Sequence, residues 1–135
     1  MSDVLIQPPR VLRGKPLSAE EVVSAVERAL LTEVRLTPKP GLVDIRNAGA
    51  HRDMDLASFE ASTAVVAPWM EKFFIMGHDT AAVAPEQVLM MLRPVGMACE
   101  NDMLEVTGGV NTHRGAIFAF GLLSAAAGRL VSKGE

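Results

Sequence analysis

The feature that most constrains the fold is the segment at residues 113–130, which is apolar on nearly every side when it is placed on a helix. A helix of this kind cannot expose most of its surface to water, so it needs other helices around it. Gly121, Ser124 and Gly128 recur along one side, where small side chains let another helix approach closely. The segment therefore predicts a central helix in a helical bundle.

Three further segments have apolar residues at helical spacing, and none shows the alternation of a strand. Ser18 and Glu21 form a capping box that opens a helix reaching about residue 36, where two prolines end it. Asp55 is a candidate N-cap for a second helix, and Pro85 suits the first turn of a third. The expected core faces are Val22, Val26, Ala29 and Leu30; then Phe59, Ser62, Thr63, Val66, Met70, Phe73 and Phe74; then Val95, Cys99, Met103 and Val106. The sequence predicts an all-α fold.

Prolines and glycines predict where these helices bend and end. Pro68 predicts a kink in the second helix, and Pro94 predicts a bend or a break in the third. The Gly108–Gly109 pair is expected to end the third helix, with one glycine in the left-handed cap conformation. Thr112 or Asn111 then caps the fourth helix. The stretch "MGHDTAAVA" is expected to connect the second helix to the third.

Composition limits the classes of protein. A length of 135 residues predicts one domain or part of one, and a hydrophobic content of 49% is enough for a core. Residues 1–17 have no periodicity and are interpreted as a flexible arm before a helical domain at 18–135. A net charge of −3 gives no general attraction to nucleic acid or anionic lipid, so any phosphate recognition must be local. Mean hydropathy is +0.23 although only six residues are aromatic, which indicates apolar surface that a partner or a missing portion would cover.

Location is suggested by the cysteine content and by the lack of long apolar runs. Cys99 is the only cysteine, so no intramolecular disulfide can form. The first residues contain no continuous apolar signal region, and the run "AIFAFGLLSAAAG" is too short to span a bilayer. We expect a cytoplasmic protein with no membrane partner.

Residues 107–114 place many hydrogen-bonding groups directly before the apolar helix. The Gly108–Gly109 pair exposes backbone N–H groups, Asn111 and Thr112 add neutral donors, and His113 and Arg114 add positive charge. A helix N-terminus favours an anion through its dipole and its unpaired amides. The spacing matches neither a Walker A loop nor a dinucleotide fingerprint. Capping explains Gly109 and Thr112 but not the adjacent Asn, His and Arg, so we favour an anion site.

Acidic residues in the first half are candidates for binding a cation. Glu33 falls within the apolar stripe of the first helix, so its carboxylate should be paired, protonated or bound to a cation; a salt bridge to a loop Arg or Lys is an equally good account. In "TPKPGLVD", Lys39 and Asp44 stand on a stiff loop that suits a polyphosphate with its divalent metal. By itself, that loop is better explained as a rigid helix terminator.

Two other clusters contain candidate acids and bases. His51, Asp53 and Asp55 alternate in "AHRDMD", which allows hard-cation or general-base chemistry, although helix capping by Asp55 is the simpler account. Glu100 lies beside the apolar face of the third helix, with Asp102 on the opposite flank. A carboxylate beside apolar surface can have a raised pKa and serve as acid or base, although Glu100 is also acceptable as an ordinary boundary residue.

Three motifs appear in one order: "LTPKPGLVD", then "GAHRDMD" followed by Phe59 and Ser62, then "TGGVNTHRGAIF". Together they resemble the triphosphoribosyl-dephospho-CoA synthase family, which makes the prosthetic-group precursor of citrate lyase and malonate decarboxylase. The resemblance covers about residues 33–128. Family members are all-helical and about twice as long, so it implies the N-terminal half of a larger helical domain. Arg114, where the citrate-lyase branch often has Lys, favours the malonate decarboxylase branch.

The resemblance implies a reaction in which the 2'-hydroxyl of 3'-dephospho-CoA attacks the anomeric carbon of ATP's ribose. Adenine leaves and the triphosphate stays on the product, so Mg²⁺ is expected. The residues expected to hold phosphates are Lys39, Gly108, Gly109, Asn111, Thr112 and Arg114. The candidates for magnesium are Glu33, Asp44, Asp53 and Asp55. Glu100 or His51 would be the base, and His113 would orient substrate or protonate adenine.

Two alternatives stay open. The same carboxylates would serve a magnesium-dependent N-glycosidase or ADP-ribose hydrolase, in which water attacks. The chain could instead be a non-catalytic nucleotide-binding or assembly module. We expect small-molecule nucleotide substrates and no nucleic acid, with either a homo-oligomer or a missing second half, and poor activity from these 135 residues alone.

Overall fold

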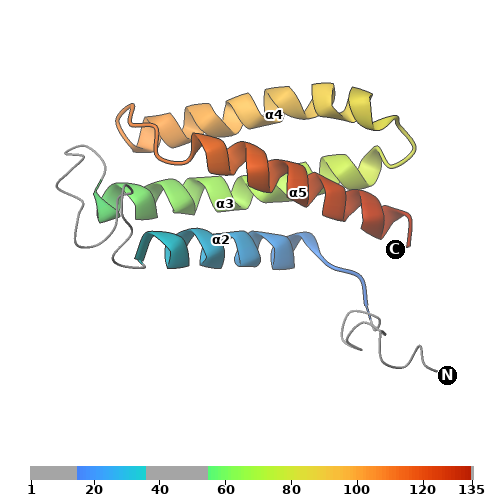
Figure 1. The fold of residues 1–135 in the computed structure, drawn as a ribbon, viewed down its shortest axis with the longest axis horizontal. Coiled ribbons are helices and arrows are strands. Elements are labelled where there is room, and N and C mark those ends of the chain that lie inside the picture. The colour runs from blue at the N-terminus through green and yellow to red at the C-terminus, as the bar shows by residue number, and fades with distance from the viewer. Residues whose placement is uncertain (1–14, 36–54, 135) are drawn as a thin grey trace.

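The computed structural model describes residues 15–35 and 55–134, and these residues form helices and no strand (Figure 1). The helices are α2 (Ala19–Arg35), α3 (Leu56–Asp79), α4 (Pro85–Val106) and α5 (Arg114–Ser132). The all-α prediction is confirmed for the described residues.

Helix α3 lies at the centre of the described structure and packs against each of the other three helices. Helices α2 and α4 run along opposite sides of α3, and α5 crosses it in front (Figure 1). Helix α5 packs mainly on α3 and touches α2 and α4 only slightly. The apolar segment at 113–130 was expected to be central, but the longer α3 takes that place.

Local helix signals in the sequence are confirmed. The Ser18 backbone N–H donates to Glu21 Oε1 at 2.9 Å, and the Glu21 N–H donates to Ser18 Oγ at 3.1 Å, which completes the capping box. Asp55 caps α3 by accepting the Ser58 N–H at 2.8 Å, and Pro85 stands in the first turn of α4. These signals involve residues close in sequence, which is why they can be read without tertiary structure.

Pro94 does not break α4, and the end of α3 differs from expectation; the kink at Pro68 and the bend at Pro94 stay predictions. Helix α4 runs unbroken through Pro94, and α3 runs unbroken through Pro68. Both prolines are exposed, so water can reach the carbonyl that each leaves without an N–H partner one turn earlier. Helix α3 also includes Met76–Asp79, which the sequence suggested as connector, and ends where the Thr80 N–H and hydroxyl both donate to the Met76 carbonyl.

The buried faces correct two predictions. In α2 the buried residues are Val22, Val26, Leu30 and Val34. This stripe at four-residue spacing continues through Val34, so Glu33 and Ala29 fall on an exposed flank and Glu33 is not within the apolar core. In α4 the buried residues are Val88, Leu92, Gly96, Cys99 and Met103, whereas Val106 is 46% exposed.

Small residues allow α3 and α5 to approach closely. A Cβ on Gly128 would lie 2.9 Å from the Phe74 carbonyl carbon, and a Cβ on Gly77 would lie 2.6 Å from the Ala125 carbonyl carbon. Gly121 faces the Phe73 ring, where an added Cβ would come within 2.6 Å, and Ser124 is buried. The predicted close approach along Gly121, Ser124 and Gly128 is confirmed, and Gly77 supplies the matching position on α3.

Among the described helices, α5 has the length and composition of a membrane-spanning helix, with 19 residues and a mean hydropathy of 1.5. The apolar run used for the sequence prediction is shorter than the helix that contains it, so the expectation that it is too short to span a bilayer does not hold for the helix. Only 28% of the apolar stretch is buried within the described structure.

Candidate active site

The groups singled out in the sequence converge at one end of the bundle. The C-terminal end of α2, the start of α3 and the α4–α5 connection lie together at the left of Figure 1. Three side chains from two of these elements, Ser62, Thr112 and His113, form the innermost polar contacts there. The site is therefore built from segments about 50 residues apart.

The α4–α5 connection is held in one shape by two glycines and a threonine. Gly108 and Gly109 both have positive φ, 68° and 94°, so both glycines, rather than one, adopt the left-handed conformation. The Gly109 N–H donates to the Leu104 carbonyl at 2.7 Å, which ends α4. The Thr107 hydroxyl donates to the Val110 carbonyl at 2.6 Å, which closes the turn.

The N-cap residue of α5 is His113, and its side chain makes no capping hydrogen bond; Asn111, rather than Thr112, caps the first amide of α5 from further upstream. Asn111 Oδ1 accepts the Arg114 N–H at 3.1 Å, while the His113 N–H points at Met103 Sδ, 3.2 Å away. Two amides at the helix start are thus engaged within the protein. Capping therefore accounts for Asn111, and Thr112 is left to do something else.

Thr112 and His113 meet Ser62 in a buried network. The Thr112 hydroxyl donates to Ser62 Oγ at 2.7 Å, and Ser62 Oγ lies 2.6 Å from His113 Nδ1. Either Ser62 or the imidazole is the donor in this contact, according to the tautomer of His113. Ser62 is fully buried and His113 is 6% exposed, with the Phe59 ring edge-on to the imidazole at 5.2 Å.

Burial sets the charge of His113. Removal from water lowers the pKa of His113 below its ordinary value of 6.5, and the negative charge of Glu33 opposes that shift in part. The imidazole is therefore neutral at pH 7. The charge of Glu33, on the exposed flank of α2, raises the pKa of His113 at the start of α5. Glu33 and His113, both singled out in the sequence, therefore belong to one site.

Arg114 and Glu100 form an ion pair on the outer side of this site. Glu100 Oε2 accepts from Arg114 Nε at 2.6 Å and lies 2.5 Å from Nη2. The Arg114 side chain is 59% exposed and that of Glu100 only 15%. The carboxylate is thus enclosed while the guanidinium still faces solvent. Asp102, on the other flank of α4 as expected, accepts the Trp69 indole N–H at 2.8 Å.

The other sequence candidates are placed as follows. Lys39, Asp44, His51 and Asp53 lie outside the described residues. Asp55 is described, and its carboxylate caps α3. In residues 15–35 and 55–134, no group of three or more His, Cys, Asp and Glu side chains is arranged to hold a metal ion. A magnesium site using Glu33 or Asp55 would therefore also need oxygen ligands from outside these ranges or from a substrate.

Sequence reasoning placed Ser62 in a core stripe and gave it no chemical role. A buried hydroxyl needs a hydrogen-bond partner, so a serine at an apolar position was the signal that could have singled it out. Cys99 is the opposite case, because it is fully buried and chemically inactive. Burial, reinforced by the charges of Asp102 and Glu100, raises the pKa of Cys99 to about 12, so its thiol is not a nucleophile near neutral pH.

Comparisons with known proteins agree on one family. The family model for ATP:dephospho-CoA triphosphoribosyl transferase (CitG) matches residues 19–135. The chain is 96% identical over all 135 residues to the 2-(5''-triphosphoribosyl)-3'-dephosphocoenzyme-A synthase of Klebsiella pneumoniae, of which it spans 45%. It is 64% identical to the protein of the same name from Escherichia fergusonii, again over its full length and 45% of that relative. A probable synthase of Albidiferax ferrireducens is 54% identical over 116 residues, which are 86% of this chain and 38% of that relative. No solved structure matches, and the chain spans less than half the length of these curated relatives.

Proposed function

This chain belongs to the ATP:dephospho-CoA triphosphoribosyl transferase family, and we propose that it forms part of an active site for that transfer. The reaction joins the 5-triphosphoribosyl group of ATP to the 2'-hydroxyl of 3'-dephospho-CoA and releases adenine. The product would be the prosthetic-group precursor for the acyl carrier protein of malonate decarboxylase or citrate lyase. A cytoplasmic location, where both nucleotides are available, is part of the proposal.

The observation that carries the proposal is the Thr112–Ser62–His113 network, whose buried imidazole directly precedes the exposed Arg114 at the start of α5. Displacement at an anomeric carbon passes through an oxocarbenium-like state and needs a base for the incoming hydroxyl. It also needs groups that hold a triphosphate still. An exposed guanidinium at this helix start can hold the triphosphate, and the fixed imidazole beside it in the sequence can orient a substrate.

Of the two roles expected for His113, orientation of substrate is the better supported. A neutral imidazole has no spare proton to give adenine at pH 7, because burial lowers the pKa of His113. Its Nδ1 is held by Ser62, so Nε2 is the ring nitrogen left to form a hydrogen bond with substrate. Ser62 and Thr112 act as positioning residues for this ring.

Arg114 is assigned to binding phosphate, and Glu100 is assigned to the role of base. A guanidinium can hold two phosphate oxygens at once, and Arg114 is exposed enough to be reached. Glu100 orients this guanidinium in the structure, and displacement of the pair by phosphate would leave Glu100 as a base. The malonate decarboxylase branch is the finer part of the proposal and depends on Arg, rather than Lys, at position 114.

Magnesium fits the site only together with a substrate. Mg²⁺ is typically bound by one or two carboxylates, waters and substrate phosphates, and when bound it would neutralise the triphosphate. Glu33, whose charge acts on His113, is the best-placed described carboxylate. Asp44, Asp53 and Asp55 remain proposed magnesium ligands and Lys39 a proposed phosphate ligand, and of these only Asp55 lies among the described residues.

The test is a product assay with ATP, Mg²⁺ and 3'-dephospho-CoA, followed by mass spectrometry. It should be run on this chain and on the longer Klebsiella relative. We expect joined product from the longer protein and little from the 135 residues alone. Ser62→Ala in the longer protein should lower kcat more than it raises KM, and Ser62→Thr should restore part of the loss.

The same assay separates the alternatives. Free adenine and ribose triphosphate without joined product would favour the N-glycosidase or ADP-ribose hydrolase. Calorimetric binding of ATP–Mg²⁺ by both proteins with no turnover in either would favour the non-catalytic module. Transfer of the product to each carrier protein distinguishes the malonate decarboxylase branch from the citrate lyase branch.

A further inference from the structure

Helix α5 carries a ridge of partly exposed apolar side chains. The ridge contains Phe118, Leu122 and Leu123, and Leu123 is 65% exposed. A soluble monomer seldom exposes contiguous large apolar side chains without a partner for them. The ridge is therefore a candidate docking surface.

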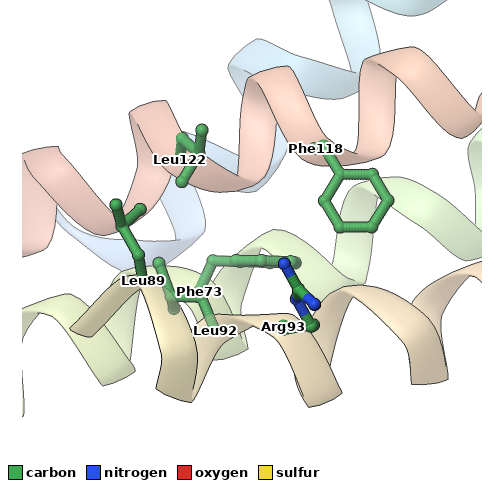
Figure 2. A pocket seen from close by; sticks show the side chains of 6 residues that line it. All are labelled: Phe73, Leu89, Leu92, Arg93, Phe118 and Leu122. Atoms are coloured by element: carbon green, nitrogen blue, oxygen red, sulfur yellow. The ribbon is translucent and has the colours of Figure 1, made fainter. Parts of the chain in front are cut away.

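An apolar groove lies on the α4 side of this ridge. Figure 2 shows Leu89, Leu92 and Arg93 of α4 opposite Phe118 and Leu122 of α5. The α3 residue Phe73 also lines this hollow of about 270 Å³. A second hollow of about 200 Å³ shares Leu89, Leu92 and Leu122, so the groove continues along the two helices. Helices α4 and α5 both pack against α3 and make few contacts with each other, so this space lies between them.

A second apolar groove of about 360 Å³ lies on the α2 side of the ridge. Its lining includes Leu17, Val22, Phe120 and Leu123, and Glu21 is the charged residue there. The ridge of α5 thus stands between two grooves. This is the shape that helix ridges fill when further helices pack at the usual interaxial distance of about 8–10 Å.

We propose that this α5 face, the ridge with its two grooves, is the docking surface for helices of the polypeptide that the longer relatives have and these 135 residues do not span. The chain spans only 45% of the Klebsiella relative, which leaves ample chain to cover the face. The lining is mostly apolar, with Arg93, Arg129 and Glu21 as its charged residues, so its occupant must present a largely apolar face. The docking proposal depends on family membership and not on the roles assigned to catalytic residues. An experiment can therefore contradict the docking surface or the catalytic roles independently.

A membrane is a poorer occupant than protein helices. Arg129 of α5 donates to the carbonyls of Thr80 at 3.1 Å and Val83 at 2.8 Å, which binds α5 to the α3–α4 connection. Gly128 and Gly77 let the α3 and α5 backbones meet. Insertion of α5 across a bilayer would break both of these contacts.

The experiment places the double substitution Leu122→Asp and Leu123→Asp in two proteins, this chain and the longer Klebsiella relative. In this chain Leu123 is 65% and Leu122 46% exposed, so helix content should be kept and the urea midpoint should fall much less than in the longer relative. In the longer relative the carboxylates would be buried at an interface, and the first unfolding midpoint should fall by about 1 M urea or more. Met90→Asp is the matched control, because Met90 is 75% exposed and lines none of these grooves.

Each other outcome overturns the proposal. Equal tolerance of the double substitution in both proteins would show that the face is uncovered in the longer one. An equal loss of stability from Met90→Asp would remove the link to this face. Light scattering that shows a dimer of this chain, abolished by the double substitution, would assign the face to a second copy. Co-flotation of the chain with phosphatidylcholine–phosphatidylglycerol vesicles, lost in the same variant, would assign it to lipid.

Discussion

Gly128→Ala tests the packing on which the whole bundle depends. An added Cβ would lie 2.9 Å from the Phe74 carbonyl carbon and 3.0 Å from the His78 nitrogen, both backbone atoms of α3. Backbone cannot rotate away as a side chain can, so α3 and α5 would have to separate. Overpacking costs about 1–3 kcal/mol, and the upper end applies to a rigid neighbour.

The helix propensity of alanine offsets part of that cost. Alanine is favoured over glycine inside a helix by about 1 kcal/mol, so the net loss should be about 2 kcal/mol. For a chain of this size that corresponds to a melting temperature lower by about 6–8 °C. Circular dichroism at 222 nm during heating, together with urea titration, measures both quantities.

Gly115→Ala is the matched control, because it is the same change in the same helix with no atom near the added Cβ. It should stabilise the chain by up to about 1 kcal/mol through helix propensity alone. Opposite signs for the two substitutions would support the close α3–α5 contact. If Gly128→Ala stabilised the protein as Gly115→Ala does, the packing described for these helices would be wrong.

Three further predictions follow from buried groups. Because burial lowers the pKa of His113, the folded chain binds fewer protons at this residue than the unfolded chain. The contribution of the neutral imidazole to the free energy of unfolding is therefore full above about pH 6.5. It is lost as the pH falls from about 6.5 through the pKa of the folded state. The urea midpoint should drop less between pH 7.5 and 5.5 in His113→Gln than in wild type, and an equal drop in both proteins would contradict the lowered pKa of His113. Ser62→Ala should destabilise the chain by about 1–3 kcal/mol, because it leaves the buried imidazole and the Thr112 hydroxyl without their partner. An unchanged midpoint in urea unfolding would contradict the network. Cys99 should resist iodoacetamide at pH 8 until urea unfolds the chain, and rapid native alkylation would show that its thiol is not buried.

The location of the candidate site could be predicted, but its internal contacts could not. The pattern of Gly108–Gly109 and Asn111 predicts a turn and a helix start from local chemistry, and the predicted anion site lies in this segment. Ser62 stood in an apolar stripe, and its partner His113 is 51 residues away. Arg114 and Glu100 were each singled out for separate roles, and their pairing came only from the fold.

The sequence by itself determined the helices of this protein, because a capping box, a first-turn proline and apolar spacing act between residues within about one or two turns. It also indicated small residues on one side of α5. Only the tertiary structure decided that Gly77 meets that side, that Glu33 turns outward while its charge acts on His113, and that α3 rather than α5 is central. Those outcomes depend on which helix faces which, and that is decided by the summed packing of residues far apart in the chain.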